Sequence, residues 1–254
     1  MKKELPDQLN VQLYFDRIAK SYPERYSSRK PFHARFFNER LHLATQKLCF
    51  EEKAIWDIGA GTGALYDLIN NQTDVFDYFA CDLSEKMMAQ SHIPPERRQI
   101  GPPYWQQFPD HFFDYIFVLG VTSYLPETTM ARWISRLNRK LKPGGQLIMS
   151  FTNQAAWEYS FRQKTRPLLQ RLANTDQLIN QSFEIQAYTV EEIISVLIPF
   201  FQLRKKYWLH TSIPALSRLW PGVSFWLGKK LARWFNLSQQ LSTDFLLILE
   251  ARPV

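Results

Sequence analysis

The residues best suited to chemistry lie between Asp57 and Gly63, where the chain reads Asp-Ile-Gly-Ala-Gly-Thr-Gly. Three glycines fall within five residues, directly after an apolar run, 54–58, that is typical of a buried parallel strand. A helical pattern follows over 64–70. A strand, a glycine turn and a helix in this order place backbone N–H groups and a helix N-terminus at the mouth of a sheet, where nucleotide-type ligands bind. The glycines permit positive φ and close approach of a ligand.

Two classes of ligand fit this glycine loop. The spacing Gly59-x-Gly61-x-x-Ala64 matches a dinucleotide-binding fingerprint. Asp57 disfavours that ligand because its carboxylate would repel a pyrophosphate, whereas it suits a ligand that carries a positive ammonium or sulfonium group. A second carboxylate, Asp82, follows 25 residues later at the end of the next expected strand. It can accept both hydrogen bonds from a ribose diol, which both ligand classes contain.

Strand and helix patterns alternate after the glycine loop and indicate an α/β fold. The expected strands are 54–58, 75–81, 98–100, 113–119, 146–151, 200–208 and 244–251. The expected helices are 7–20, 31–49, 64–70, 85–90, 128–141 and 190–198. Ser84 is suited to cap the fourth helix, and a capping box begins the last one at Thr189. The Lys-Pro-Gly-Gly segment 142–145 is expected to separate a helix from the fifth strand.

Four stretches occur in an informative order: the glycine loop, Asp82, the strand 113–119 and the segment 137–151. Together they resemble the class I S-adenosylmethionine (SAM) dependent methyltransferases over roughly residues 54 to 151. The resemblance implies a Rossmann-like α/β fold: a seven-stranded, mostly parallel sheet with helices on both faces and an antiparallel last hairpin. It also implies SAM as the cofactor. The implied cofactor-binding residues are Asp57, Gly59, Ala60, Gly61, Gly63, Asp82, Leu83 and Leu119.

The N-terminal segment 14–22, Tyr-Phe-Asp-Arg-Ile-Ala-Lys-Ser-Tyr, resembles the lid of small-molecule methyltransferases of the ubiquinone/menaquinone-biosynthesis type. That resemblance implies that residues 1–50 form a helical lid on a SAM-binding domain, 51–254, and that Tyr14 and Tyr22 reach the cofactor. Insertions after the fifth and sixth strands are expected at about 153–188 and 209–240, with helical character over 168–179. They would complete an acceptor pocket.

The chain departs from the family pattern after its third strand. Such enzymes often carry an acidic residue there that contacts the adenine amino group, but residues 100–105 read Ile-Gly-Pro-Pro-Tyr-Trp. The Gly-Pro-Pro-Tyr part is similar to the signature of enzymes that methylate amino nitrogens of bases or glutamine. That signature belongs after the fourth strand, so a nucleic-acid methyltransferase is disfavoured.

The general base is left open by the sequence. Methyl transfer from an activated sulfonium needs mainly positioning and the exclusion of water, and it needs a base only when the nucleophile must lose a proton. Candidates near the expected mouth of the sheet are His33, His111, Tyr124 and Asn153. Each could equally be a packing or surface residue, and the acceptor atom could be oxygen, nitrogen or carbon.

Size and composition fit one domain with additions, since 45% of the 254 residues are hydrophobic. The longest apolar run, 193–201, is shorter than the roughly 20 residues of a membrane-spanning helix. The polar N-terminus lacks the apolar core of a signal peptide, so we expect a cytoplasmic protein. Cys49 and Cys81 are too few for a disulfide framework or a zinc site, and we expect core thiols and no metal.

The net charge of +7 arises in one C-terminal stretch. Residues 193–243 contain seven Lys or Arg and no Asp or Glu, while the rest of the chain has 24 basic and 24 acidic residues. Trp and Phe mixed with these cations over 204–236 suit peripheral contact with an anionic membrane, or a pocket for an amphiphilic anionic acceptor. They also suit RNA, which is the less favoured partner, or the solvated surface of a substrate cap.

The sequence therefore favours SAM-dependent methyl transfer to a small or lipid-like acceptor. A hypothesis from a different class is a non-catalytic protein of the same fold, whose basic C-terminal stretch binds a membrane or a partner. An RNA methyltransferase and an NAD-dependent oxidoreductase are less favoured alternatives, the latter because of Asp57 and the segment 142–145.

Overall fold

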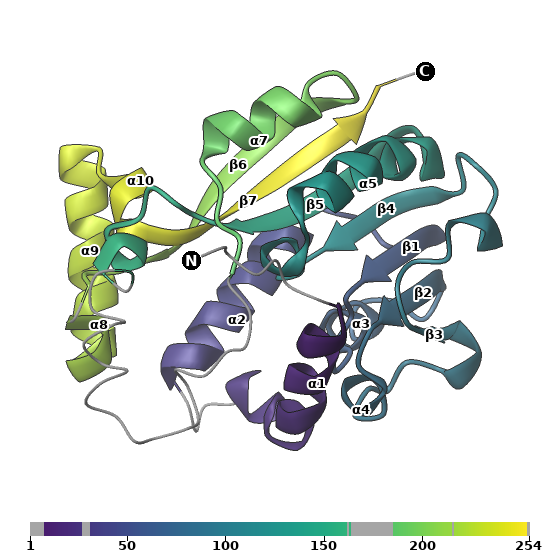
Figure 1. Ribbon diagram of the computed structural model, residues 1–254, viewed down its shortest axis with the longest axis horizontal. Coiled ribbons are helices and arrows are strands. Elements are labelled where there is room, and N and C mark those ends of the chain that lie inside the picture. The colour runs from purple at the N-terminus through teal and green to yellow at the C-terminus, as the bar shows by residue number, and fades with distance from the viewer. Residues whose placement is uncertain (1–7, 27–30, 162, 164–184, 215, 253–254) are drawn as a thin grey trace.

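The computed structural model describes residues 8–26, 31–161, 163, 185–214 and 216–252, and it is built around one seven-stranded sheet (Figure 1). The strands are β1 (Lys53–Ile58), β2 (Phe76–Asp82), β3 (Arg98–Ile100), β4 (Phe113–Val118), β5 (Leu141–Thr152), β6 (Phe201–Thr211) and β7 (Ser242–Ala251). Their order is β3-β2-β1-β4-β5-β7-β6. Strands β1 to β5 pair in parallel, and β7 runs antiparallel to both β5 and β6. This confirms the expected mostly parallel sheet with an antiparallel last hairpin.

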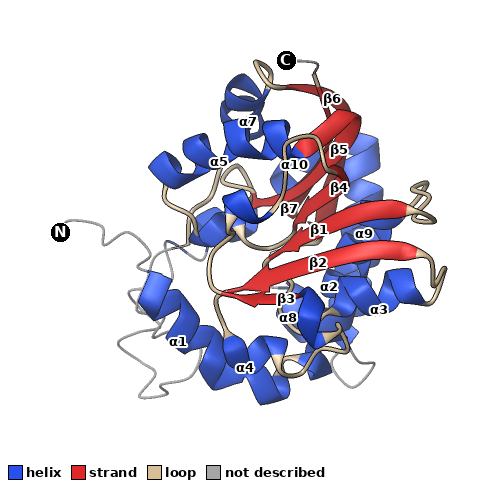
Figure 2. Cartoon of the chain, turned by 90° about the vertical axis from the view of Figure 1, so that its right-hand side faces the viewer, coloured by secondary structure: helices blue, strands red, loops and turns tan. Residues whose placement is uncertain are grey.

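Helices cover both faces of the sheet (Figure 2). The α-helices are α1 (Gln8–Ile18), α2 (Pro31–Thr45), α3 (Ala64–Asn70), α4 (Glu85–Met88), α5 (Glu127–Lys140), α7 (Val190–Leu197), α8 (Leu216–Leu219), α9 (Pro221–Phe235) and α10 (Ser238–Leu241). Short 3₁₀ turns are η1 (Ala19–Ser21), η2 (Pro23–Tyr26), η3 (Pro95–Arg97), η4 (Trp105–Gln107) and η5 (Thr122–Tyr124).

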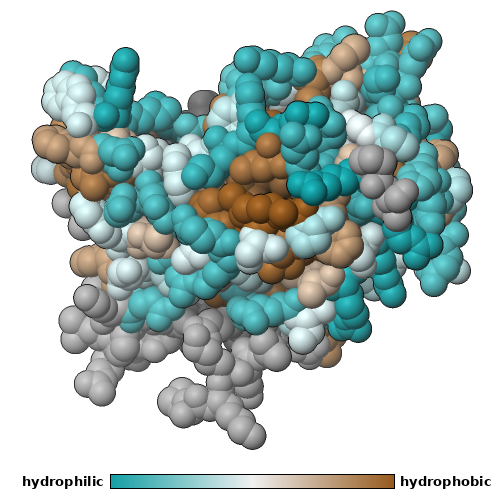
Figure 3. All heavy atoms as spheres, turned by 90° about the horizontal axis from the view of Figure 1, so that it is seen from above, coloured by the Kyte–Doolittle hydropathy of each residue, from teal (hydrophilic) through white to brown (hydrophobic). Residues whose placement is uncertain are grey.

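The hydrophobic core has one layer on each face of the sheet. One layer joins α5 and α7 to Trp56 and Ile58 of β1, and the other joins α2 and α3 to Ile55. Successive strand residues therefore point to opposite layers, as the two-residue period of a strand requires. Seen from above, the space-filling view shows a group of hydrophobic atoms near the middle of that face, with hydrophilic atoms around them (Figure 3).

The helix caps expected from the sequence are present in the structure. Ser84 caps α4 by accepting a hydrogen bond from the Met87 N–H, and Thr189 and Glu192 form a complete capping box at the start of α7. The segment 142–145 behaves differently, because β5 already pairs with β4 at Leu141. Residues 142–145 stand opposite the single β4 residue Asp114, so they make a bulge inside the strand instead of a separate turn, with Gly144 at a φ of 76°.

Two other expectations concern single side chains and the insertion. Cys81 is buried as expected, whereas Cys49 is exposed, because it lies in the connection between α2 and β1. The expected helical segment 168–179 lies outside the described residues.

In the part of the chain that is described, no helix has both the length and the apolar character needed to cross a membrane. Those same residues include no group of three or more His, Cys, Asp or Glu that could hold a metal ion.

Candidate functional site

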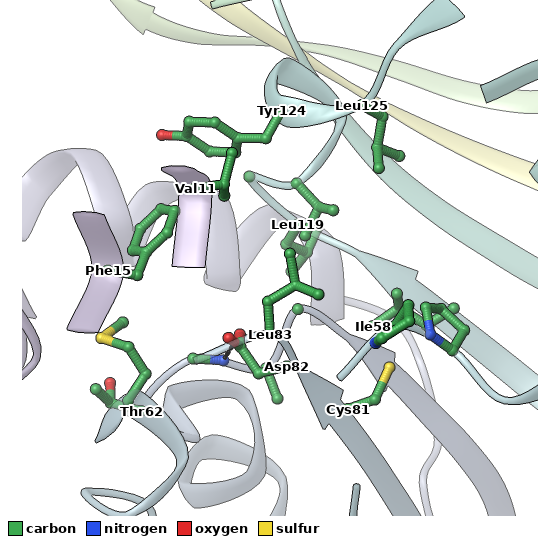
Figure 4. A pocket seen from close by; sticks show the side chains of 18 of the residues that line it. Val11, Phe15, Ile58, Thr62, Cys81, Asp82, Leu83, Leu119, Tyr124 and Leu125 are labelled. Carbon is green, nitrogen blue, oxygen red and sulfur yellow. Dashed lines mark hydrogen bonds between the residues drawn. The ribbon is translucent and has the colours of Figure 1, made fainter. Parts of the chain in front are cut away.

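A cleft opens at the carboxyl ends of β1, β2 and β4. The strand order reverses between β1 and β4, and in open α/β sheets ligands bind at such switch points. The floor of the cleft is formed by three segments that directly follow these strands: 58–62, 81–83 and 119–121. The roof comes from α1, η2, α2 and η5, which supply mainly apolar and aromatic side chains (Figure 4).

The glycine loop is fastened to the end of β2. The N–H groups of Gly59 and Ala60 donate to the Cys81 carbonyl at 2.7 and 3.1 Å, and the N–H of Gly61 donates to Asp82 Oδ2 at 2.8 Å. These three donors are already used inside the protein, so they do not form a free anion-binding nest for a pyrophosphate. Instead, the loop lets a ligand come close to its backbone. Gly59 and Gly61 have φ values of 81° and 57°, which favour glycine.

Asp57 is buried directly beneath the loop and does not line the cleft. Its Oδ2 accepts a 2.6 Å hydrogen bond from the phenol of Tyr78 on β2. Burial raises the pKa of Asp57 to about 7, the Tyr78 hydrogen bond acts against that shift, and the charge of Asp82 adds to it. The carboxyl is therefore poised to change its protonation with its surroundings, and a nearby positive charge would favour the ionised form.

Asp82 stands in the floor with both carboxylate oxygens in use. Oδ2 accepts from Gly61 and Oδ1 accepts from the N–H of Ser84, each at 2.8 Å. Burial raises its pKa, and these two backbone hydrogen bonds oppose the shift. Each carboxylate oxygen can accept more than one hydrogen bond, so the side chain keeps capacity for two hydroxyl groups in the cleft.

Five rings form what we call the aromatic roof: Phe15, Tyr22, Tyr26, Phe37 and Tyr124. The rings form a continuous row of contacts. The ring centroids are 5.3 Å apart for Phe15 and Tyr124, 6.2 Å for Phe15 and Tyr22, and 5.7 Å for Tyr22 and Phe37. Figure 4 shows Phe15 and Val11, which belong to the same helix, close to Tyr124 on one side of the cleft. Burial is the main cause that raises the pKa of each of the three tyrosines, so their phenols stay protonated near neutral pH.

Arg40 of α2 also lines the cleft, and sequence reasoning missed it. One guanidinium nitrogen donates to Asp244 of β7 at 3.1 Å, and the guanidinium lies over the rings of Phe36 and Phe37. Its Nη1 would stand only 2.5 Å from a Cβ at Gly120, so glycine is needed there for the arginine to fit. No local pattern marks this residue, because its partners come from the far end of the chain.

A polar contact joins the N-terminal helix α1 to the floor, in addition to the ring contacts. Asp16 of α1 accepts a hydrogen bond from the Ser84 hydroxyl, which also accepts from the Met87 N–H as the α4 cap. We call the Asp16–Ser84 contact the latch. It joins the N-terminal helix to the loop that carries Asp82, so the roof and the floor are directly connected.

The structure brings most of the predicted cofactor residues together. Lining residues among them are Gly59, Ala60, Gly61, Asp82, Leu83, Leu119 and Tyr22. Gly63 lies one step beyond the cleft at the start of α3, where a Cβ would meet Ser91 at 2.8 Å. Tyr14 does not line the cleft, because neighbouring helix positions point about 100° apart and Phe15 faces inward instead.

The structure does not bring two of the base candidates into the cleft. His111 precedes β4, so it lies at the opposite end of that strand from the cleft, where its Nδ1 contacts the Leu141 carbonyl at 3.0 Å. Asn153 is fully buried, and its amide donates to the Gln239 and Ser242 carbonyls. Tyr124 lines the cleft, but with its raised pKa it acts as a phenol. His33 falls in α2, and its side chain lies outside the described part of the structure.

The far end of the floor has no carboxylate from the third strand, as the sequence indicated. Gly101, Pro102 and Pro103 line the cleft there, together with Trp133 of α5. The N–H of Gly101 donates to the Asp82 carbonyl at 2.7 Å and ties this wall to the end of β2. The wall is apolar and flat-sided, so it would receive a planar ring by packing and not by a charged contact.

Residues 56–147 match the family model described as a methyltransferase domain. Over these residues the chain is similar to methyltransferase domains, and its fold is that of SAM-dependent methyltransferases of known structure. The match begins inside β1 and ends inside β5, so it covers the strands that build the floor. No curated protein gives a significant match.

Solved structures share the fold at low sequence identity. Magnesium protoporphyrin IX methyltransferase of Synechocystis PCC 6803, solved with SAH bound, has a TM-score of 0.61 and 13% identity, over 97% of this chain and 99% of that one. The [4+2]-cyclase SpnF has a TM-score of 0.62 and 14% identity, over 98% and 97%. The phosphoethanolamine N-methyltransferase 2 of Haemonchus contortus has a TM-score of 0.61 and 14% identity, and this chain covers 60% of it. Because these likenesses include a cyclase, they establish the fold and leave the reaction to be argued from the site.

Proposed function

We propose that this chain transfers a methyl group from SAM to a small or lipid-like acceptor. The observation that carries the proposal is one cleft in which the glycine loop and Asp82 face a roof of aromatic side chains. SAM supplies a methyl group that its positive sulfur already activates, so the reaction is an in-line displacement. The protein's task is to hold both reactants and to exclude water.

The floor has a suitable group for each part of the cofactor. Asp82 would accept hydrogen bonds from the ribose hydroxyls, and Leu83 with the proline wall would pack on the adenine. The glycine loop would receive the methionine end, with the Asp57 carboxylate close beneath it for the ammonium group. Arg40 is the cation that faces the cleft from the lid, so we assign it to the methionine carboxylate.

The acceptor's character follows from the roof. Among the described residues that line the cleft, Arg40 and Asp82 carry the charges, and the other roof side chains are mainly rings and aliphatic groups. Such a surface suits an uncharged or amphiphilic molecule with a flat or aliphatic body. This supports residues 1–50 as a lid that forms one side of the acceptor pocket. The described residues of the insertions 153–188 and 209–240 do not line the cleft.

The nucleophile of the acceptor is expected to attack without a strong protein base. The described lining includes no His, Lys or Glu, and the tyrosine phenols of the roof stay protonated. A neutral amine, or an oxygen, sulfur or carbon that is already ionised, meets this condition. The roof phenols would orient such a group by hydrogen bonding.

Isothermal titration with SAM and with S-adenosylhomocysteine tests the proposal. We expect saturable binding of both ligands, and we expect Asp82→Ala to weaken it by about 1.5–3 kcal/mol, or about 10- to 150-fold, through the lost charged hydrogen bonds. The matched control is Asp77→Ala on the same strand, because that carboxylate is exposed and pairs with Arg97 away from the cleft. Absence of binding by the folded protein at submillimolar ligand would reject the proposal.

A second candidate is a protein of this fold that does not transfer a methyl group. The lack of a base among the described lining residues favours it, and so does the cyclase among the fold's relatives. The two candidates differ in turnover. With apolar amines, phenols and thiols offered as acceptors, methyl transfer predicts that S-adenosylhomocysteine accumulates, whereas the second candidate predicts binding without product.

A further inference from the structure

Helix α9 packs on the protein through its small residues. Ser224, Gly228 and Ala232 lie on its buried face together with Phe225. A Cβ at Gly228 would stand 2.9 Å from the Ser212 Cα and 3.0 Å from the Thr211 carbonyl oxygen, so the helix lies directly against the end of β6. The Ser224 hydroxyl also bonds to the backbone of Ile213. The helix is therefore firmly seated.

The outward face of α9 carries several large apolar side chains, although Phe225 is buried. Val223, Trp226 and Trp234 are each more than half exposed, and so are Trp220 before the helix and Phe235 at its end. Positions 223, 226, 230 and 234 follow the spacing of one helical stripe. This arrangement reverses the usual one, in which large apolar residues face the core. Hydrophobic atoms are visible at the α9 end of the molecule, at the left of Figure 3.

Cations are interleaved with this aromatic stripe. Lys230 Nζ lies 3.9 Å from the centre of the Trp226 ring and 5.7 Å from that of Trp234, and Arg233 is exposed beside them. Not every cation of the acid-free stretch is available. Arg204 forms a bidentate pair with Glu250, and Lys229 turns toward Glu39 of α2 at 3.0 Å. Lys205 and Lys206 are also exposed, but they lie on β6, so the outer face of α9 is the part of 204–236 where a cation lies between exposed Trp rings of one helix.

We propose that the outer face of α9 docks on an anionic membrane surface. Trp and Phe rings are favourable at the boundary between headgroups and acyl chains, and Lys and Arg beside them reach lipid phosphates. The absence of Asp and Glu from 193 to 243 removes the main source of repulsion from such a surface. This docking requires neither SAM binding nor methyl transfer.

The geometry favours lipid over RNA as the partner. Binding of single-stranded RNA relies on aromatic faces that are open for base stacking. Here Lys230 occupies the face of Trp226, so a base would have to displace a cation that already stabilises the ring. In a bilayer interface the same pair keeps its contact, with the ring among acyl chains and the ammonium group at the phosphates.

Sedimentation with vesicles tests this assignment on the full chain. We expect binding to phosphatidylcholine vesicles that contain phosphatidylglycerol, weaker binding to phosphatidylcholine alone, and release by salt. Lys230→Gln/Arg233→Gln should lower the partition coefficient on anionic vesicles about thirtyfold. This follows because each of the two cations contributes about 1 kcal/mol near such a surface. Trp226→Ser/Trp234→Ser should lower binding to both kinds of vesicle at least about tenfold.

Matched controls remove the same groups elsewhere on the surface. Lys86→Gln/Arg132→Gln takes away two exposed cations on α4 and α5, and Trp157→Ser takes away an exposed indole outside α9. Both controls should bind vesicles as the parent does. The proposal is overturned if the parent ignores anionic vesicles, if the α9 variants bind like the controls, or if α9 binds an RNA oligonucleotide but no vesicle. Circular dichroism melting confirms that each variant is folded.

Discussion

The floor and the roof of the cleft are built in different ways. The floor consists of backbone that leaves β1, β2 and β4, and parallel pairing fixes where those segments begin. Its loop is then tied by hydrogen bonds to Cys81 and Asp82. The roof consists of side chains from α1, η2, α2 and η5, which touch mainly through ring contacts.

This difference predicts how each part responds to change. Backbone in the floor has little room to move, so a single added methyl group should affect the position of several donors at once. Rings in the roof share their contacts, so the loss of one contact leaves the others in place. We therefore expect floor variants to reduce cofactor binding severely and roof variants to adjust it.

The largest effect is expected from Gly59→Ala. The new Cβ would stand 2.1 Å from Val121 Cγ2, and the φ of 81° is unfavourable for alanine. Strain and overpacking together cost about 2–4 kcal/mol, and relief requires the loop to leave its place on β2. We expect the affinity for SAM in isothermal titration to fall at least about a hundredfold.

Gly144→Ala is the matched control for that variant. Gly144 has a nearly equal φ of 76°, but no atom lies within 4 Å of its added Cβ, and it is in the bulge of β5. It should lower the melting temperature by the φ strain alone and leave SAM affinity as it is. Equal affinities for the two variants would show that the floor is not the rigid part of the cleft.

The floor was predictable from sequence because its geometry is local. The strand, the glycines, Asp82 and the Ser84 cap lie within 31 residues of Lys53, and each has its own spacing signal. The roof was predictable only in part. The lid resemblance indicated Tyr22 and the position after β4 indicated Tyr124, whereas Phe15 and Phe37 carry no spacing signal and meet the others only in the folded chain. Arg40 shows the same limit, because its partner Asp244 is 204 residues away.

The sequence-based expectations that the structure did not meet have a similar cause. His111 carries suitable chemistry, but whether a residue lies before or after a strand decides which end of the sheet it occupies, and His111 lies before β4. The apolar positions of α9 were visible in the sequence, yet their exposure was not. Burial of that helix depends on Gly228 fitting against Ser212, which no helical period reveals.

An effect of intermediate size is expected from Asp57→Asn, and it concerns the pH dependence of SAM affinity. The unfolded chain ionises this carboxyl near pH 4, but the folded protein keeps it protonated up to about 7, so Asp57 lowers the stability of the free protein as pH rises between those values. A bound ammonium group favours the ionised form. SAM affinity in the parent should therefore rise about tenfold from pH 6 to pH 8.

Asp57→Asn should remove most of that dependence while Asp82 remains in both proteins. Titrations at pH 6, 7 and 8 measure it, with S-adenosylhomocysteine as a second ligand that keeps the ammonium group but lacks the sulfonium. A slope that is the same in the parent and the variant would assign the pH dependence to another group and would place the ammonium away from Asp57.

The smallest effect is expected from Asp16→Ala, which opens the latch between roof and floor. This variant is cleaner than one at Ser84, because the Ser84 hydroxyl also caps α4 and would lose both roles. One hydrogen bond contributes about 1 kcal/mol, and the ring contacts of Phe15 remain, so SAM affinity should fall no more than about fivefold. Amide hydrogen exchange in α1 should become about fivefold faster, while exchange in β1 and β4 stays unchanged.

Arg17→Ala, an exposed neighbour on the same helix, should leave both measurements as they are. A loss of affinity as large as that of Gly59→Ala would mean that the latch positions Asp82 itself, and the roof would then be as rigid a part of the cleft as the floor.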